Sequence, residues 1–284
     1  MAHSFKRPEL FFFILLVLLA IPLLGHALAV EQAEPSHIKV SLVAESTSFI
    51  PGKDFMVGIH FLINKGWHLY WLNPGDSGLP PSVTWHLPKG FKASDLVWPL
   101  PTRLPLPSLM DYGYQDQLLL MAPIHVSKNV QTGTPVTLKA DVKWLVCREE
   151  CIPGKGTVRL TLPVQAKDQV TQTLFEQTRK NQPKKLPKGW KALGKLDKDG
   201  FKLTVQTPGT HAKTGQFFPV DLNVIDNTAD QNFSTGVGSF VLGLKKSDQL
   251  MKAPDSLKGL LVISGEGYDG KVGYWVDVPL TGKP

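Results

Sequence analysis

The sequence predicts an all-β protein that contains two antiparallel β-sandwich domains. Two observations support this prediction. Many short stretches alternate apolar and polar residues, which is typical of strands that bury one face. Segments rich in Gly and Pro, which favour turns, separate these stretches along the chain. Two alternating stretches, the first of them the longest in the chain, lie on either side of Cys147 and Cys151, the only two cysteines in the sequence.

The two long stretches predict a β-hairpin over residues 136–162. Alternation runs from 136 to 146 and again from 157 to 162, and Pro153 with the glycines near it interrupts the segment between them. Four residues of extended strand span about 13 Å, whereas the Cα atoms of a disulfide usually lie about 4.4–6.8 Å apart. The two cysteines can therefore pair only if the backbone folds back between them, and a turn over 148–150 would allow this.

The residues alone leave two roles open for such a disulfide. A five-residue loop gives only about 2 kcal/mol of stabilisation in the chain-entropy model, and a chain of 284 residues can build its core without this bridge. A weakly stabilising bridge at the tip of a loop is the kind that opens and closes easily. A redox-active pair and a structural bridge are therefore both compatible with the pattern, and metal binding by the two thiols has less support.

The first 29 residues have the features of a secretory signal peptide. Lys6 and Arg7 precede an apolar stretch over 11–24, and the small residues Ala27 and Ala29 then form a cleavage pattern. The alternative is an uncleaved membrane anchor, but the apolar stretch is short for a membrane span. We expect removal of the leader, a soluble mature protein and an oxidising compartment in which cysteines can pair.

The charge and the motifs exclude several classes of function. The formal net charge is +7, and the positive residues are spread out except in a Lys-rich stretch over 179–202. We interpret this stretch as a solvated linker rather than a nucleic-acid site. The sequence has no P-loop, HExxH, GxSxG or zinc-finger spacing. We therefore expect no cofactor, no nucleic-acid partner and no stable small-molecule ligand.

The alternating stretches divide the mature chain into two domains. We expect a first domain over 30–165 that carries the cysteines, a helix and linker over 166–185, and a second β-sandwich domain over 186–284. Asp168 is a suitable N-cap for the helix. The second domain has alternating stretches, for example at 220–224, but no cysteine and no visible chemistry. Its expected role is support or docking.

Several motifs together resemble one protein family, the N-terminal periplasmic region of the bacterial DsbD/ScsB-type thiol:disulfide interchange proteins. The motifs are Gly66-Trp67-His68, Trp71, Asn73-Pro-Gly-Asp-Ser-Gly-Leu-Pro80, Tyr112-Gly-Tyr114 and Trp144-Leu-Val-Cys-Arg-Glu-Glu-Cys-Ile-Pro-Gly154. Phe217-Phe-Pro219 and Ile225-Asp-Asn227 in the second half are similar to the ScsB-like branch. The resemblance covers nearly the whole mature chain.

The resemblance implies immunoglobulin-like domains and a cysteine pair that carries electrons in the periplasm. In the full-length proteins a membrane domain and a thioredoxin-like domain refill the pair, which then reduces periplasmic thiol–disulfide proteins. Carried over to this sequence, Cys151 would attack the partner disulfide and Cys147 would resolve the mixed disulfide. Because the sequence stops at Pro284 without those two domains, we expect a separate membrane or thioredoxin-like electron donor. The activity would be that of a protein-disulfide reductase or an electron-carrier domain.

The family also has a loop that shields its cysteines, and Tyr112 and Tyr114 are the candidates for it here. Trp71 and Asp76 are further candidates for lining the same site. The alternative for the two tyrosines is an ordinary corner of the β-sandwich. For Trp71 and Asp76 the alternatives are positions in the core and in a turn.

Two other functions remain as alternatives. Thiolates and imidazoles bind copper, and family members linked to copper tolerance make a copper-binding module that includes His68 or His86 conceivable. However, no two histidines stand at ligand spacing beside the cysteines. The second alternative is a structural or interaction β-sandwich with a static disulfide. Metal uptake by the reduced protein tests the copper hypothesis, and the ease of reduction tests the static disulfide.

Overall fold

The computed structural model describes residues 37–164, 173–209, 211–266 and 268–282. Within these ranges nearly all of the regular secondary structure consists of strands, with one short helix, so the predicted all-β sandwich class is confirmed. The predicted signal peptide lies outside the described residues. No helix within the described ranges is both long and apolar enough to span a bilayer.

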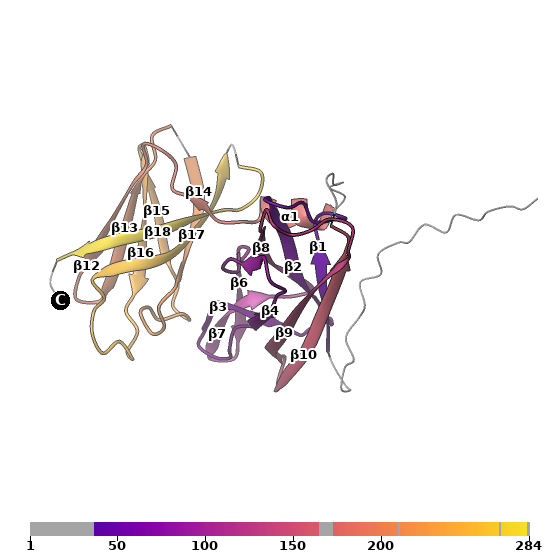
Figure 1. Cartoon of the computed structure of the whole chain (residues 1–284). Coiled ribbons are helices and arrows are strands. Elements are labelled where there is room, and N and C mark those ends of the chain that lie inside the picture. Colours follow the sequence, from indigo (N-terminus) through magenta and orange to yellow (C-terminus); the bar gives the residue numbers. More distant parts are fainter. Residues whose placement is uncertain (1–36, 165–172, 210, 267, 283–284) are drawn as a thin grey trace, which may run out of the picture.

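The first half of the chain forms two main sheets and a smaller one (Figure 1). The first sheet has the order β1 (Ile38–Ala44), β2 (Asp54–Ile63), β8 (Gln117–Val126), β5 (Phe91–Ala93). The second has the order β10 (Cys151–Leu162), β9 (Val136–Cys147), β4 (Ser82–His86). The third has the order β3 (Leu69–Gly75), β7 (Leu109–Tyr114), β6 (Thr102–Leu106).

Alternating side chains from these sheets fill the core of the first half. Phe61 of β2 is fully buried and meets the edge of Trp144 of β9, with ring centroids 6.4 Å apart. Trp144 is the inward-facing residue that the alternation predicts. The predicted hairpin is confirmed, because β9 and β10 pair antiparallel along their whole length, from Val136–Leu162 to Cys147–Cys151.

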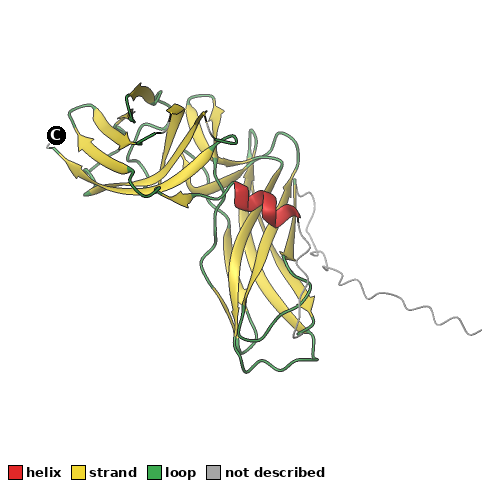
Figure 2. Cartoon of the chain, turned by 90° about the horizontal axis from the view of Figure 1, so that it is seen from above, coloured by secondary structure: helices red, strands yellow, loops and turns green. Residues whose placement is uncertain are grey.

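The helix α1 (Thr173–Lys180) follows the first half and covers the outer side of β8. Phe175 is fully buried there against Leu119 and Met121. Figure 2 shows the helix beside the junction between the two halves of the chain. The predicted helix begins earlier, near Asp168, but residues 165–172 lie outside the described residues.

The second half forms a continuous path of strands that folds around its own core. Its order is β14 (His211–Pro219), β17 (Ser256–Glu266), β18 (Val272–Thr281), β12 (Lys191–Leu196), β13 (Gly200–Gln206), β16 (Ser239–Lys245), β15 (Asn232–Gly236), and β11 (Lys184–Lys185) pairs with β18. The strand predicted at 220–224 is wrong. This segment is a turn in which Asn223 has a φ of 58° and Leu222 is 58% exposed, so the alternation there does not reflect a buried face.

The two halves share core residues along β14 and β17. Phe217 points into the second core and its neighbour Phe218 into the first. In the same way, Leu260 belongs to the first core and Leu261 to the second. Figure 1 shows β14 and β17 on the side of the second half that faces the first. We call these two strands the β14–β17 wall, because each face of the wall covers a different core.

Candidate functional site

The two cysteines form a disulfide at the tip of the β9–β10 hairpin. Cys147 ends β9 and Cys151 begins β10, and the two residues lie directly opposite each other in the register. Their Cα atoms are 4.1 Å apart. The backbone N–H of Arg148 donates to the carbonyl of Glu150 over 3.0 Å, which closes the turn between them. The chain therefore folds back over 148–150, as a disulfide at this spacing requires.

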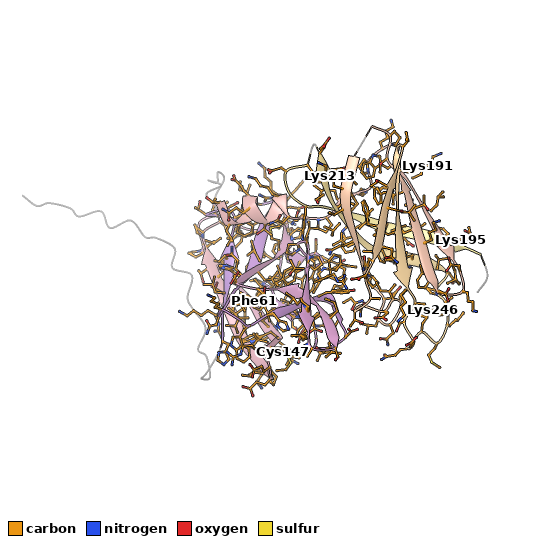
Figure 3. The ribbon with its side chains drawn as sticks, turned by 180° about the vertical axis from the view of Figure 1, so that it is seen from behind. Phe61, Cys147, Lys191, Lys195, Lys213 and Lys246 are labelled. Carbon is orange, nitrogen blue, oxygen red and sulfur yellow. A yellow bond between two sulfur atoms is a disulfide. The ribbon has the colours of Figure 1, made fainter. Side chains whose placement is uncertain are left out.

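The two cysteines differ in their access to solvent. Cys147 is only 2% exposed, whereas Cys151 is exposed. The reason is the backbone of His68, whose N–H donates to Cys147 O over 2.9 Å and whose carbonyl accepts from Cys147 N over 3.1 Å. Cys147 thus lies between two neighbouring segments, whereas β10 is an edge strand of its sheet. A reagent from solvent meets the sulfur of Cys151 first. Figure 3 shows Cys147 at one end of the first half, with Phe61 further inside it.

Tyr70 of β3 places a hydroxyl group beside this exposed sulfur. Its Oη lies 3.7 Å from Cys151 Sγ. A disulfide sulfur carries no hydrogen, so the hydroxyl is the donor in this contact. Burial raises the pKa of Tyr70 to about 12. The phenol therefore keeps its proton at any physiological pH and remains able to donate to a sulfur atom.

A buried polar cluster lies behind Tyr70. Asp111 is fully buried, and its carboxylate accepts from Ser77 N over 3.0 Å and from Ser77 Oγ over 3.0 and 2.9 Å. His68 Nε2 lies 3.5 Å from Asp111 Oδ2 and makes no hydrogen bond within the described residues. The imidazole of His68 meets the Tyr70 ring edge-on at 5.1 Å. These contacts place one carboxylate, one imidazole and one phenol next to the disulfide.

The turn at Gly78 covers the ring of Tyr70. Gly78 has a φ of +83°, which favours glycine, and a Cβ at this position would lie only 2.1 Å from Tyr70 Cζ. The segment can therefore lie flat on the phenol only because it has no side chain there. On the other side of the tip, the Arg148 guanidinium lies 5.4 Å from the centre of the Trp67 ring, at a distance that allows a cation–π contact.

Three of the four candidate shielding residues contact the second half of the chain. Tyr112 Oη donates to Asn227 Oδ1 over 2.9 Å, and Asp76 Oδ1 accepts from Asn227 Nδ2 over 2.7 Å. Trp71 stacks on Trp275, with ring centroids 6.2 Å apart. These contacts give the three residues a place in the junction, and a shielding role for them stays a prediction.

The fourth candidate, Tyr114, is buried and donates from its Oη to Pro99 O over 2.8 Å. Its shielding role also stays a prediction. Tyr70, whose side chain contacts a cysteine sulfur, is not among the site residues that the sequence predicts, and His68 is predicted only as part of the family motif and as a metal ligand. A signal was present, because residues two apart in a strand share a face. His68 and Tyr70 therefore put two polar groups on one face of an aromatic strand.

The described residues contain no group of three or more His, Cys, Asp or Glu side chains arranged to hold a metal ion. The two histidines of the copper hypothesis contact different carboxylates. His68 faces Asp111, and His86 Nε2 lies 2.7 Å from Asp141 Oδ2 on the exposed side of the hairpin.

Comparison with known proteins identifies the first half. Residues 39–163 match the family model for the N-terminal domain of the thiol:disulfide interchange protein DsbD. The N-terminal periplasmic domain of ScsB from Proteus mirabilis has a similar fold, with a TM-score of 0.61 and 16% identity over 86% of this chain and 94% of that one. The predicted resemblance to the DsbD/ScsB group is thereby confirmed.

Two other solved structures are much less similar. The major pilin subunit BcpA of Bacillus cereus, in its D312A form, has a TM-score of 0.28 at 9% identity, over 86% of this chain and 67% of that one. The YadV chaperone has a TM-score of 0.23 at 10% identity, over 84% of this chain and 100% of that one. Neither value supports a shared fold. No curated protein sequence matches this chain significantly.

Proposed function

We propose that this chain, whose residues 39–163 form a DsbD-type thiol:disulfide interchange module, passes electrons to partner proteins through Cys147 and Cys151. One observation carries the proposal. The disulfide joins a buried cysteine to an exposed one at the tip of a hairpin, and a protonated phenol lies beside the exposed sulfur. A bridge with one accessible sulfur is suited to exchange with another protein, because the attacking group and the resolving group are distinct.

The exchange takes place in two steps. In the reduced protein the Cys151 thiolate attacks one sulfur of the partner's disulfide. A mixed disulfide forms, and the partner's other sulfur leaves as a thiolate. Cys147 then attacks Cys151 Sγ as a thiolate, which restores the Cys147–Cys151 bond and releases the second thiolate of the partner. The partner gains two electrons, and the two protons lost by the cysteines balance those that its thiolates take up.

Tyr70 assists the first step by donating a hydrogen bond to the sulfur of Cys151. A hydrogen bond to the charged form of a group lowers its pKa, so this contact favours the thiolate, which is the reactive species. The polar cluster of Asp111, Ser77 and His68 holds the Tyr70 ring from behind. Cys147 is opposite Cys151 in the hairpin register, so the resolving sulfur needs no large movement of the backbone.

The proposed setting is the periplasm, after removal of residues 1–29. The acceptors are periplasmic thiol–disulfide proteins, and a membrane or thioredoxin-like protein refills the pair. Residues 30–165 act as the redox domain, and residues 186–284 form a second domain joined to it by the helix and linker at 166–185. The match to the DsbD N-terminal family and the fold of the ScsB periplasmic domain support this setting.

The first test is the reduction potential of the Cys147–Cys151 pair. The protein is equilibrated in graded thiol/disulfide buffers, its free thiols are alkylated, and the added mass is counted. A midpoint of about −180 to −270 mV, the range of exchange proteins, is the expected result. A midpoint below about −300 mV would indicate a structural bridge and contradict the proposal.

Single substitutions test the order of the two cysteines. Reduced Cys147→Ser keeps the exposed sulfur and should form a mixed disulfide rapidly with a model disulfide such as Ellman's reagent. Reduced Cys151→Ser keeps only the buried sulfur and should react far more slowly. Neither variant should complete a catalytic cycle, and equal rates for the two variants would refute the assigned order. Circular dichroism checks that both variants keep the native fold.

A further inference from the structure

The exposed face of the hairpin carries four cations that follow the register of its strands. We propose that this face binds an acidic surface of the thiol–disulfide partner, next to the point where Cys151 exchanges. The proposal rests on the proposed function and adds to it the chemistry of the partner. We call this surface the basic face and define it by Lys139, Lys143, Lys155 and Arg159.

The cations lie in two pairs across the hairpin. Lys143 is directly opposite Lys155, and Lys139 is directly opposite Arg159. Ala140, Val142 and Val158, which alternate with the cations on β9 and β10, are buried, so the cationic side chains project to the other, outer side of the sheet. Lys143, Lys155 and Arg159 are exposed and Lys139 is half-buried.

These cations form no ion pair within the described part of the chain, and of the four only Lys139 contributes to lowering the pKa of the nearby Asp141. None of the four has a carboxylate within 4.0 Å there. The single acid between the two pairs, Asp141, accepts from Thr157 Oγ1 over 2.6 Å and lies 2.7 Å from His86 Nε2. Like charges placed directly opposite in a sheet are destabilising. Two such pairs on one hairpin therefore have no benefit for the fold itself and indicate a partner of opposite charge.

The position of the basic face relates it to the disulfide. Leu145 and Pro153 are opposite each other and separate the cysteines from Lys143 and Lys155. Lys155 is four residues from Cys151 along an extended strand, which is about 13 Å. A standard protein interface buries about 800 Å² on each partner, so a protein that reaches Cys151 also covers this pair of lysines.

The charges of the turn at the hairpin tip indicate from which side the partner approaches. Glu149 and Glu150 are exposed there, beside the exposed Arg148. The charge thus changes from positive on the sheet to slightly negative at the turn. An acidic partner surface is favoured over the sheet and disfavoured over the tip, so the partner is expected to approach along β9 and β10 rather than end-on.

The test uses three nine-residue peptides with a central cysteine flanked by Glu, Gln or Lys. The peptide thiolate attacks Cys151 Sγ, a peptide–Cys151 disulfide forms, and Cys147 leaves as a thiolate. The rate of this step is followed by acid quenching and mass spectrometry and is expressed per thiolate, since the flanking charges change the thiol pKa. At low ionic strength the Glu peptide should react about tenfold faster than the Gln peptide, the lower end of electrostatic steering. The advantage should shrink at 0.15 M salt, where the Debye length is about 8 Å.

Two double variants change the net charge of the protein by the same amount. They therefore distinguish an effect of the basic face from an effect of the protein's net charge. Lys143→Glu/Lys155→Glu should abolish or reverse the preference for the Glu peptide. Lys191→Glu/Lys195→Glu alters two exposed lysines in the second half, far from Cys147 in Figure 3, and should leave the preference unchanged. Equal rates for all three peptides, or equal effects of both double variants, would overturn the proposal.

Binding of peptides to the basic face can also be measured without disulfide exchange. This measurement tests the basic face even if the Cys147–Cys151 disulfide does not react. The same peptides with Ser in place of Cys are titrated into ¹⁵N-labelled protein. The Glu peptide should shift the amide signals of β9 and β10, and the Lys peptide should not. If the thiol peptides all fail to react while these shifts appear, the basic face stands and the exchange function fails. If the face instead binds anionic phospholipid vesicles and shows no preference among the peptides, the proposal of a protein partner is overturned.

Discussion

The two halves of the molecule bury their polar groups for different purposes. The first half buries His68 and Asp111 beside Tyr70, whose hydroxyl contacts the disulfide. The polar residues that the second half buries within the described ranges are Thr207 and Asn227. Asn227 contacts the first half. The first half thus has buried polar groups that surround the residue contacting the disulfide, whereas one of the two buried polar residues of the second half attaches it to the first.

One short segment of the first half links the second half to the surroundings of the disulfide. Asn73 is bonded to the second half, where its Nδ2 donates to Pro219 O over 2.9 Å. A few residues further along the chain, Ser77 bonds Asp111 and Gly78 lies on Tyr70. One short segment, residues 73–78, therefore contacts the second half at one end and the site at the other.

Phe217→Ala and Phe218→Ala compare the two faces of the β14–β17 wall. Both side chains are almost fully buried, so each change should lower the free energy of unfolding by about 3–5 kcal/mol. Amide hydrogen exchange should locate the damage. Phe218→Ala should speed exchange in β3 and β7, because Phe218 packs against Tyr112 at 4.9 Å, and Phe217→Ala should act on β13 and β16. If Phe218→Ala left β3 and β7 protected, the shared core would be refuted.

Asn227→Ala and Thr207→Val compare the two buried polar residues of the second half. Asn227→Ala leaves the buried hydroxyl of Tyr112 without its acceptor, which should cost about 1–3 kcal/mol in urea denaturation. Thr207 Oγ1 has no hydrogen-bond partner in the described part of the chain, so Thr207→Val should leave stability unchanged or raise it. A larger loss for Thr207→Val than for Asn227→Ala would contradict the assigned roles.

Tyr70→Phe and Tyr112→Phe separate the site from the junction within the first half. Loss of the Tyr70 hydroxyl removes the donor to Cys151, so the pKa of the Cys151 thiol in the reduced protein should rise, because a hydrogen bond to the thiolate is lost. The pH dependence of alkylation, measured in the reduced Cys147→Ser background, reports this pKa. Tyr112→Phe removes a hydroxyl that bonds Asn227 and should leave the thiol pKa unchanged. Equal shifts in both variants would show that Tyr70 has no specific effect.

The smallest effect concerns acid sensitivity of the second half. The hydrogen bond from Lys245 holds the pKa of Asp226 at about 2, below its ordinary value of 3.8. A carboxyl whose folded pKa is lowered stabilises the fold above its unfolded pKa, and this contribution is lost as the pH falls from about 4 to about 2. Asp226→Asn keeps an acceptor for Ala229 N but removes the charge. The variant should be less stable than wild type at about pH 5, and chemical denaturation should show the difference disappearing near pH 2.

The hairpin and its disulfide could be predicted from the sequence because their signals are local. Alternation over 136–146 and 157–162 specifies the faces of two neighbouring strands, and the spacing of the cysteines requires a fold-back between them. The family resemblance implies the same pair, Cys147 and Cys151. The family model for the DsbD N-terminal domain matches residues 39–163. The register, with Cys147 opposite Cys151, follows from a short turn between paired strands.

The environment of the disulfide could not be predicted, because it depends on contacts between distant parts of the chain. Tyr70 is 81 residues from Cys151 in sequence, and no local pattern indicates that they meet. The bond from Tyr112 to Asn227 spans 115 residues. Alternation at 220–224 predicted a strand where the chain turns, because a period of two does not reveal whether a partner strand is available.

The β14–β17 wall also influences how the protein is made. A chain emerges from the ribosome from its N-terminus, and domains generally fold as units in that order. The first half, however, receives its last core residues only when Phe218, Leu260 and Val262 have been synthesised. Until then Trp71 and Tyr112, which are fully buried in the finished protein, lack the contacts that Phe218 makes with both rings. The core of the first half is therefore complete only after the chain has been synthesised as far as Val262.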